Sequence, residues 1–312
     1  MQYLIIFAEK LQETMKTEFA IWMVSYLIRR GPDTQENIIN EWSKHINEDV
    51  EIHRNTFGNY RRKAEELFGT EISYNSVTKE YYIEDKDLIT HNAMYRWLLQ
   101  SVSASNVISK RSRLKDRIML ETTSGGEEFI EPITEAMEKE LCIKMVYQAF
   151  WDESKERTVE PYYIKFFKRR WYLIGKRRDT EEFRTYCFDR IRSLSLSHIK
   201  YKFKKEQSSE TLFYDYYGII QYPVEKERVI IKVTCEQGMY IKTLPLHHSQ
   251  KLIHQDDDYM TFELYLKPCY DFVKELLSWG SELEVISPES LRKEVNQYAM
   301  EMCEIYNPKD NG

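Results

Sequence analysis

The stretch Lys165–Arg192, KFFKRRWYLIGKRRDTEEFRTYCFDRIR, decides the fold of the middle of this chain. Apolar and aromatic residues alternate in it with polar ones, which is the period-two pattern of a half-buried β-strand. The polar turn RRDTEE at 177–182 separates one strand-like run from the next. We therefore expect consecutive antiparallel strands here. Alternation also predicts that Trp171 and Leu173 face a core and that Tyr172 faces the other way.

The same stretch is strongly basic, although the 312-residue chain has a formal net charge of −6. Arginine binds phosphate through two parallel hydrogen bonds, and aromatic rings beside it add flat surfaces for stacking. The pattern therefore predicts a site for a phosphate-bearing ligand. The basic residues are Lys165, Lys168, Arg169, Arg170, Lys176, Arg177, Arg178, Arg184, Arg190 and Arg192.

Strand-like runs continue on both sides of this stretch, so that five short runs lie between residues 143 and 203. Five short strands in such close succession predict a small antiparallel β-barrel, which closes its own edges. Beyond it, the pattern from Glu227 to Ser287 predicts the order β-α-β-β-α-β, a ferredoxin-like unit. A last helix is expected over Pro288–Tyr306.

Before the barrel, residues 14–85 predict three helices and a two-stranded hairpin. Gly31 and Pro32 end the first helix, and this order is typical of a winged helix-turn-helix. The third helix, His53–Phe68, would enter the major groove, although a basic outer face is also usual for a solvated amphipathic helix. The residues expected to contact DNA are Arg54, Asn55, Asn59, Arg61, Arg62 and Lys63.

Residues 88–141 predict a helical connector that carries one apolar stripe: Met94, Trp97, Leu98 and Val102. The stripe fits either a dimer seam or packing on a neighbouring domain. We favour the seam, because paired half-sites on DNA suit a two-fold homodimer.

The central residues resemble the WYL domain. The resemblance rests on Trp171-Tyr172-Leu173 with Ile174-Gly175, on Arg184, on Phe188-Asp189-Arg190-Ile191, and on Tyr147 and Val159-Glu160-Pro161 upstream. The tail LLSWGSELEVISPESLRKEV at 276–295 is similar to the C-terminal extension of bacterial WYL transcription regulators. The third helix lacks the serine-arginine-threonine core that is common in that family.

The resemblance implies an α+β multidomain protein of four segments. A winged helix-turn-helix DNA-binding domain would cover 1–86 and a helical linker 87–141. A small Sm-like antiparallel β-barrel, the WYL domain, would cover 142–205, and a ferredoxin-like extension 206–312. Such a protein is a ligand-responsive DNA-binding transcriptional regulator, whose barrel senses a nucleic-acid or nucleotide-like anionic ligand.

Four residues are the expected ligand contacts: Arg184, Arg190, Tyr172 and Tyr147. The two arginines are expected on neighbouring strands, pointing to one face and presenting guanidinium groups to phosphate. The tyrosines would stack on a base or donate their hydroxyls. Asp189 is expected to pair with an arginine or to cap a turn, whereas Lys168, Arg169 and Arg170 are expected to be a solvated turn.

Several classes of protein are disfavoured. The five cysteines are scattered singly without metal-ligand spacing, and HExxH, GxxxxGK[ST], GxGxxG and GxSxG are all missing from the sequence. We therefore expect no enzyme, no cofactor and no metal. The first residues of the sequence lack the basic region and the cleavage site of a signal peptide. No apolar segment approaches the length of a membrane span, so a cytoplasmic location is expected.

Two other functions stay open. The first is a single-strand nucleic-acid-binding accessory protein of a bacterial defence system, without operator binding, in which the N-terminal helices only mediate assembly. The second is an enzyme that acts on nucleotides. The operator, the ligand, the sign of regulation and the dimer geometry are not encoded in any recognisable pattern.

Overall fold

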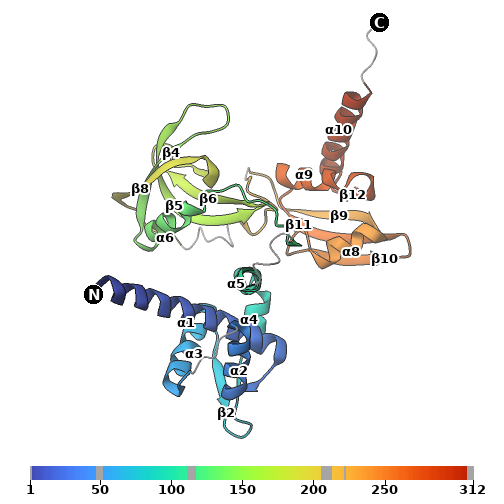
Figure 1. The fold of residues 1–312 in the computed structure, drawn as a ribbon. Helices are drawn as coiled ribbons and strands as arrows, with labels where there is room; N and C mark the ends of the chain where they lie inside the picture. Colours follow the sequence, from blue (N-terminus) through green and yellow to red (C-terminus); the bar gives the residue numbers. More distant parts are fainter. Residues whose placement is uncertain (1, 47–51, 111–116, 205–212, 221–222, 308–312) are drawn as a thin grey trace. The chain divides into compact units, whose positions relative to one another are not determined.

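A computed structural model of the protein describes residues 2–46, 52–110, 117–204, 213–220 and 223–307 (Figure 1). The chain divides into two compact units, Met1–Glu121 and Thr122–Gly312. The chain is mixed α/β with antiparallel sheets, as predicted. The finer division into four segments stays a prediction.

The first unit contains the predicted three helices and hairpin. The helices are α1 (Gln2–Arg30), α2 (Gln35–Ile46) and α3 (Arg54–Phe68), and the strands are β1 (Asp33–Thr34), β2 (Ile72–Asn75) and β3 (Glu80–Ile83). The strands form an antiparallel sheet of order β1-β3-β2. Helix α1 begins well before the expected start near Glu18, and it ends at Gly31, whose φ of +90° a residue with a side chain rarely adopts.

Aromatic side chains from all three helices form the core of this unit. Phe19 of α1 lies edge-on to Trp42 of α2 at 5.2 Å and to Phe57 of α3 at 6.1 Å between ring centroids. All three are buried. Edge-to-face pairs of this kind add to the hydrophobic effect and fix the angles between the helices.

Two further helices, α4 (Lys86–His91) and α5 (Ala93–Lys110), complete the first unit. The stripe predicted as a dimer seam lies on α5, and it is divided. Leu98 and Val102 pack against the core just described, whereas Met94 and Trp97 are exposed. Half of the stripe is therefore packing within the chain, because α5 lies against α1.

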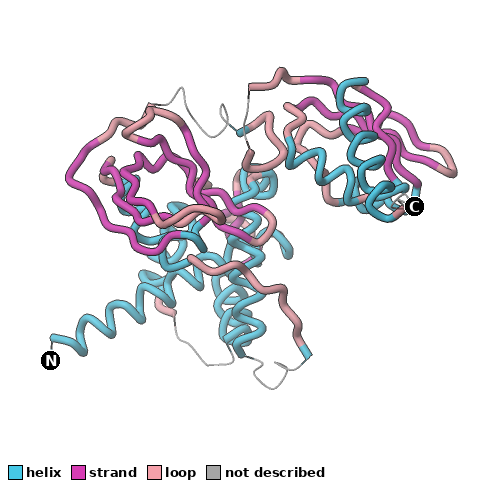
Figure 2. The backbone as a smooth tube through the Cα atoms, turned by 90° about the horizontal axis from the view of Figure 1, so that it is seen from above, coloured by secondary structure: helices cyan, strands magenta, loops and turns pink. Residues whose placement is uncertain are grey.

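The second unit begins with a five-stranded antiparallel sheet of order β7-β6-β5-β4-β8. Figure 2 shows this sheet strongly curled. Its edge strands are β7 and β8, and no ladder joins them within the described residues, so the predicted closed barrel is not confirmed. The strands are β4 (Leu141–Tyr147), β5 (Lys155–Phe167), β6 (Arg170–Arg177), β7 (Phe183–Cys187) and β8 (Ile191–Lys200).

One face of the sheet packs against α6 (Ile130–Glu138). Ile133 and Ala136 of the helix, with Leu173 of β6, are among the buried residues of that core. Trp171 is half-buried against it, which confirms the predicted orientation of Trp171 and Leu173. Gly175 is required next to them, since a Cβ there would lie 2.3 Å from the side chain of Val159.

The rest of the second unit has the predicted order β-α-β-β-α-β, followed by a helix. Its four strands form an antiparallel sheet of order β10-β11-β9-β12. Among the described residues, no helix has both the length and the apolar character to cross a membrane. The elements are β9 (Glu227–Thr234), α8 (Cys235–Thr243), β10 (Lys251–Gln255), β11 (Tyr259–Leu266), α9 (Tyr270–Ser278), β12 (Leu283–Ser287) and α10 (Glu289–Tyr306).

The segment 213–220 connects the two sheets of this unit. On one side, Lys165 of β5 donates a 2.5 Å hydrogen bond from Nζ to the carbonyl oxygen of Gly218, and Thr185 of β7 donates to that of Ile219. On the other side, Asp271 of α9 accepts hydrogen bonds from the backbone N–H groups of Ile219 and Ile220 at 2.8 and 2.9 Å. The segment thus contacts the strands that carry the candidate ligand residues.

Candidate functional site

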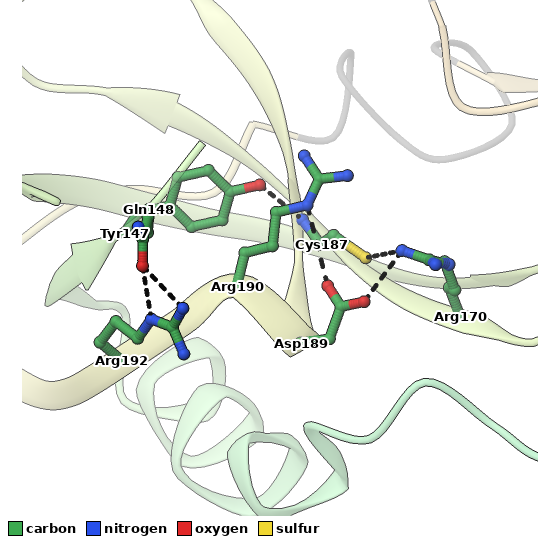
Figure 3. A network of polar contacts seen from close by, with 7 residues as sticks. All are labelled: Tyr147, Gln148, Arg170, Cys187, Asp189, Arg190 and Arg192. Atoms are coloured by element: carbon green, nitrogen blue, oxygen red, sulfur yellow. Dashed lines mark hydrogen bonds and ion pairs between the residues drawn. The ribbon is translucent and has the colours of Figure 1, made fainter. Parts of the chain in front are cut away.

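Polar side chains gather where β7 ends and the chain turns into β8 (Figure 3). The turn is a 3-10 helix, η3 (Phe188–Arg190), and it places Asp189 and Arg190 beside the start of β6. Arg170 donates from Nη1 to Asp189 Oδ2 at 2.9 Å. The hydroxyl of Tyr147, from β4, accepts a hydrogen bond of 3.2 Å from the backbone N–H of Cys187. Tyr172 pairs with Cys187 across β6 and β7.

Arg190 of this cluster is stacked on an aromatic ring and also lies near the carboxylate of Asp189. Its guanidinium carbon lies 3.3 Å from the ring centroid of Phe150. Its Nε is 4.0 Å from Asp189 Oδ1 and, within the described part of the chain, this buried atom has no hydrogen-bond partner. Figure 3 shows the outer end of the guanidinium pointing away from Asp189. This arrangement leaves donors available to an anion.

The two tyrosine hydroxyls of the cluster are neutral donors at physiological pH. Burial is the main cause that raises the pKa of Tyr172 to about 12, and the neighbouring Cys187 adds to it. Burial also raises the pKa of Tyr147, against the opposing effects of its hydrogen bond from Cys187 and of the Arg190 charge. A protonated phenol beside an arginine can donate to phosphate oxygen.

The structure brings two of the four predicted ligand residues together, Tyr147 and Arg190, whereas Tyr172 lies beside Cys187 and Arg170. Arg184 is separate from them. It leaves β7 on the same face as Tyr186, opposite to Cys187, and its Nη2 lies 2.5 Å from Glu182 Oε2. The expectation that both arginines lie on strands and share a face is wrong, because Arg190 lies in the turn, where strand alternation no longer applies.

Sequence reasoning missed two members of the cluster, Arg170 and Phe150. Arg170 was assigned to a solvated turn, but it is the first residue of β6 and lies two residues before Tyr172, so both side chains leave the same face. That spacing was a usable signal. The prediction that Asp189 pairs with an arginine is confirmed. Phe150 follows the end of β4, and no local pattern connects it with Arg190.

Helix α3 carries the residues predicted to contact DNA, and the structure divides them. Asn55, Asn59 and Arg62 are exposed, and Arg62 donates a hydrogen bond to Asn59. Arg61 instead donates to the carbonyl oxygen of Ile72 at 3.0 Å. Lys63 pairs with Glu13 of α1 at 3.1 Å. The side chain of Arg54 lies outside the described atoms.

A hollow of about 450 Å³ lies at the exposed end of this group. It is lined by Asn55, Asn59 and Arg62, together with Tyr81 of β3, among others. In the ranges that the structure describes, no group of three His, Cys, Asp or Glu side chains is placed to hold a metal ion.

Two domain families match parts of this chain. The WYL domain matches residues 128–196, and the WCX domain matches residues 225–303. A WYL domain and a WCX domain are thus found in these two parts of the chain, which confirms the resemblance seen in the central residues.

The chain is 22% identical over 250 residues to the uncharacterized HTH-type transcriptional regulator YobV of Bacillus subtilis strain 168, covering 78% of this chain and 76% of YobV. Among solved structures, proteasome accessory factor B/C of Arthrobacter aurescens matches with 16% identity and a TM-score of 0.34. That match covers 90% of this chain and 46%, less than half, of the other. A CRISPR Cas-related protein matches with 13% identity and a TM-score of 0.35, covering 99% and 92%.

Proposed function

We propose that this chain is a DNA-binding transcriptional regulator whose WYL domain binds a nucleic-acid or nucleotide-like anion. The class of protein is supported by the WYL and WCX domains and by the similarity to an HTH-type transcriptional regulator. The ligand is supported by one observation above all. Arg190 is stacked on Phe150, its Nε has no hydrogen-bond partner among the described residues, and it lies beside the protonated hydroxyl of Tyr147.

The first unit is the proposed DNA-binding domain, a winged helix-turn-helix. Helices α2 and α3 would form the helix-turn-helix, and the β2–β3 hairpin would be the wing. Asn55, Asn59 and Arg62 are exposed on α3 and are the proposed base and phosphate contacts. Arg54, Arg61 and Lys63 stay in the proposed interface, with Arg61 acting by joining α3 to the wing through Ile72.

The second unit is the proposed sensor. The curled sheet would be an Sm-like barrel that stays open between β7 and β8, and the WCX part would be a ferredoxin-like extension. A ligand regulates DNA binding only if it binds the DNA-competent and the incompetent form with different affinity. We propose a homodimer for the DNA-bound form, because two half-sites suit two-fold symmetry.

Fluorescence anisotropy on a labelled duplex from the protein's own upstream region tests this function. Wild-type protein should bind the duplex, and a short single-stranded oligonucleotide should change its affinity. Arg62→Gln should weaken duplex binding, whereas Arg190→Gln should keep duplex binding and lose the response to the oligonucleotide. Sequence-independent duplex binding in every ligand state would overturn the proposal. So would a shortened labelled oligonucleotide after incubation with Mg²⁺, because it would show an enzyme.

A further inference from the structure

Three arginines leave the core face of the sheet from three adjacent strands. Arg157 lies on β5 two residues before Val159, and Val159 pairs with Arg177 of β6. On the next strand, Arg184 pairs with Gly175, which lies two residues before Arg177. Paired residues share a face, and so do residues two apart, so all three side chains project to one side. Gly175 has no side chain to separate them.

Tyr186 lies on the same face, two residues after Arg184, and only 5% of it is exposed. Its hydroxyl is a buried atom with no hydrogen-bond partner among the described residues. Burial raises the pKa of Tyr186 to about 12, while the nearby charges of Arg177, Arg157 and Arg184 oppose that rise. The hydroxyl is thus a protonated donor among three guanidinium groups. Buried donors are normally satisfied, so an unsatisfied one surrounded by cations indicates a missing acceptor.

The groups that now pair with these arginines would compete only weakly with a phosphate for them. Arg177 donates to Asp179 from Nε at 2.8 Å and also from Nη2, and Arg184 pairs with Glu182. Both carboxylates belong to the exposed β6–β7 hairpin, with side chains 57% and 53% exposed. In the described part of the chain, Arg157 donates a hydrogen bond to the carbonyl oxygen of Glu156 at 3.2 Å. Exposed ion pairs contribute little to stability, so a phosphate displaces these carboxylates at small cost.

We propose that Arg157, Arg177, Arg184 and Tyr186 form a second phosphate subsite, which extends the ligand site assigned above and rests on that assignment. The two subsites adjoin, because the rings of Tyr147 and Tyr186 meet edge-to-face with centroids 5.0 Å apart. The ligand therefore carries at least two phosphate groups. A short oligonucleotide satisfies both subsites, whereas a nucleoside monophosphate satisfies one.

The test compares thymidine monophosphate with a 5′-phosphorylated thymidine dinucleotide by calorimetry on the full chain. Wild-type protein should bind the dinucleotide about tenfold tighter or more, the usual effect of added hydrogen bonds to a charged group. Arg177→Gln should remove most of this advantage and leave the mononucleotide affinity unchanged. Lys176→Gln is the matched control, because Lys176 is the neighbour on the same strand and leaves the opposite face.

Equal affinity of wild type for the two ligands would overturn the second subsite and leave the proposed function intact. An equal effect of Arg177→Gln and Lys176→Gln on the dinucleotide would do the same. Binding of neither ligand, nor of longer single strands, would overturn the proposed function as well. Increasing salt provides a further readout: the logarithmic slope of dinucleotide binding should fall by about 0.7 in Arg177→Gln, as for the loss of one phosphate contact.

Tyr186→Phe separates a binding role from a structural one. The variant removes a hydroxyl that has no hydrogen-bond partner among the described residues, so its melting temperature should equal or exceed that of wild type. Its affinity for the dinucleotide should nevertheless fall severalfold, with the mononucleotide affinity unchanged. A lower melting temperature together with unchanged dinucleotide binding would show that the hydroxyl serves the fold, and would overturn its place in the subsite.

Discussion

Arg170 donates a hydrogen bond of 2.9 Å to Asp189, and this pair joins the first residue of β6 to the turn between β7 and β8. The turn carries Arg190, and β6 carries Tyr172 two residues after Arg170. The pair therefore holds two proposed ligand contacts at a defined separation. Asp189 also lies 4.0 Å from Arg190 Nε, so one carboxylate sits between the two arginines of the cluster.

Asp189→Asn should lower the free energy of unfolding by about 1–2 kcal/mol, the usual effect of losing a charge-assisted hydrogen bond between half-buried groups. Urea denaturation measures it as a lower midpoint at unchanged slope. Asp152→Asn is the control, since Asp152 forms an exposed pair with Lys155 and should change stability by less than about 0.5 kcal/mol. Equal effects of the two substitutions would contradict the role given to the Arg170–Asp189 pair.

Phe150→Leu should weaken ligand binding about two- to fivefold, because a guanidinium on an exposed ring gains roughly 0.5–1 kcal/mol. The leucine keeps apolar bulk but removes the ring 3.3 Å from Arg190. Calorimetry with a phosphorylated dinucleotide measures the change. Phe150→Tyr preserves the ring and should restore wild-type affinity; a loss of the same size in the tyrosine variant would show that the ring is not what holds Arg190.

Arg61 and Arg62 are neighbours on α3 with different expected effects. Arg62→Gln should weaken duplex binding and reduce its salt dependence by about one unit of slope, as for one lost phosphate contact on B-DNA. Arg61→Gln should lower the free energy of unfolding by about 1–2 kcal/mol, because the half-buried Arg61 holds the Ile72 carbonyl. Anisotropy and urea denaturation of both variants measure these effects. The prediction fails if Arg62→Gln is the less stable protein and binds DNA normally.

Lys165 should make stability depend on pH in the alkaline range. Burial lowers its pKa from 10.5 to about 8, with partial compensation from Asp271. Between these values the unfolded chain binds more protons than the folded one, so stability rises with pH through this window. The cost of the buried charge is fully present below pH 8 and is at most about 3 kcal/mol. Relative to Lys165→Met, wild type should gain stability from pH 8 to 10 in urea denaturation. Parallel curves would contradict a lowered pKa.

Local patterns predicted most of the elements. Period-two alternation identified all five strands of the curled sheet, and it placed Leu173 in the core and Trp171 against it. Helical periodicity and the Gly31-Pro32 stop identified the first three helices. These predictions from periodicity succeed because side-chain direction within one element depends only on the spacing along the chain. The start of α1 was missed by about sixteen residues, since the N-terminal segment has no recognisable helix start.

The candidate site was predicted in part. Tyr147, Tyr172 and Arg190 were named from the resemblance to the WYL domain, and Tyr147 and Arg190 do lie together. The shared face expected for Arg184 and Arg190 was wrong, because a 3-10 turn interrupts the strand between them. The same alternation of side chains between the two faces of a strand, applied with the observed strand register, places Arg184 on one face with Arg157 and Arg177 instead. Strand register was not available from the sequence.

The amino-acid sequence by itself determined the order of the elements, the faces of single strands and the domain families that the central and C-terminal parts match. These depend on residue spacing and on motifs that are contiguous in the chain. Only the tertiary structure decided which charges are paired and which are not. Phe150 meets Arg190, Arg170 meets Asp189, and Tyr186 is left without a partner among the described residues, because chain reversal and register bring together groups that no local pattern relates.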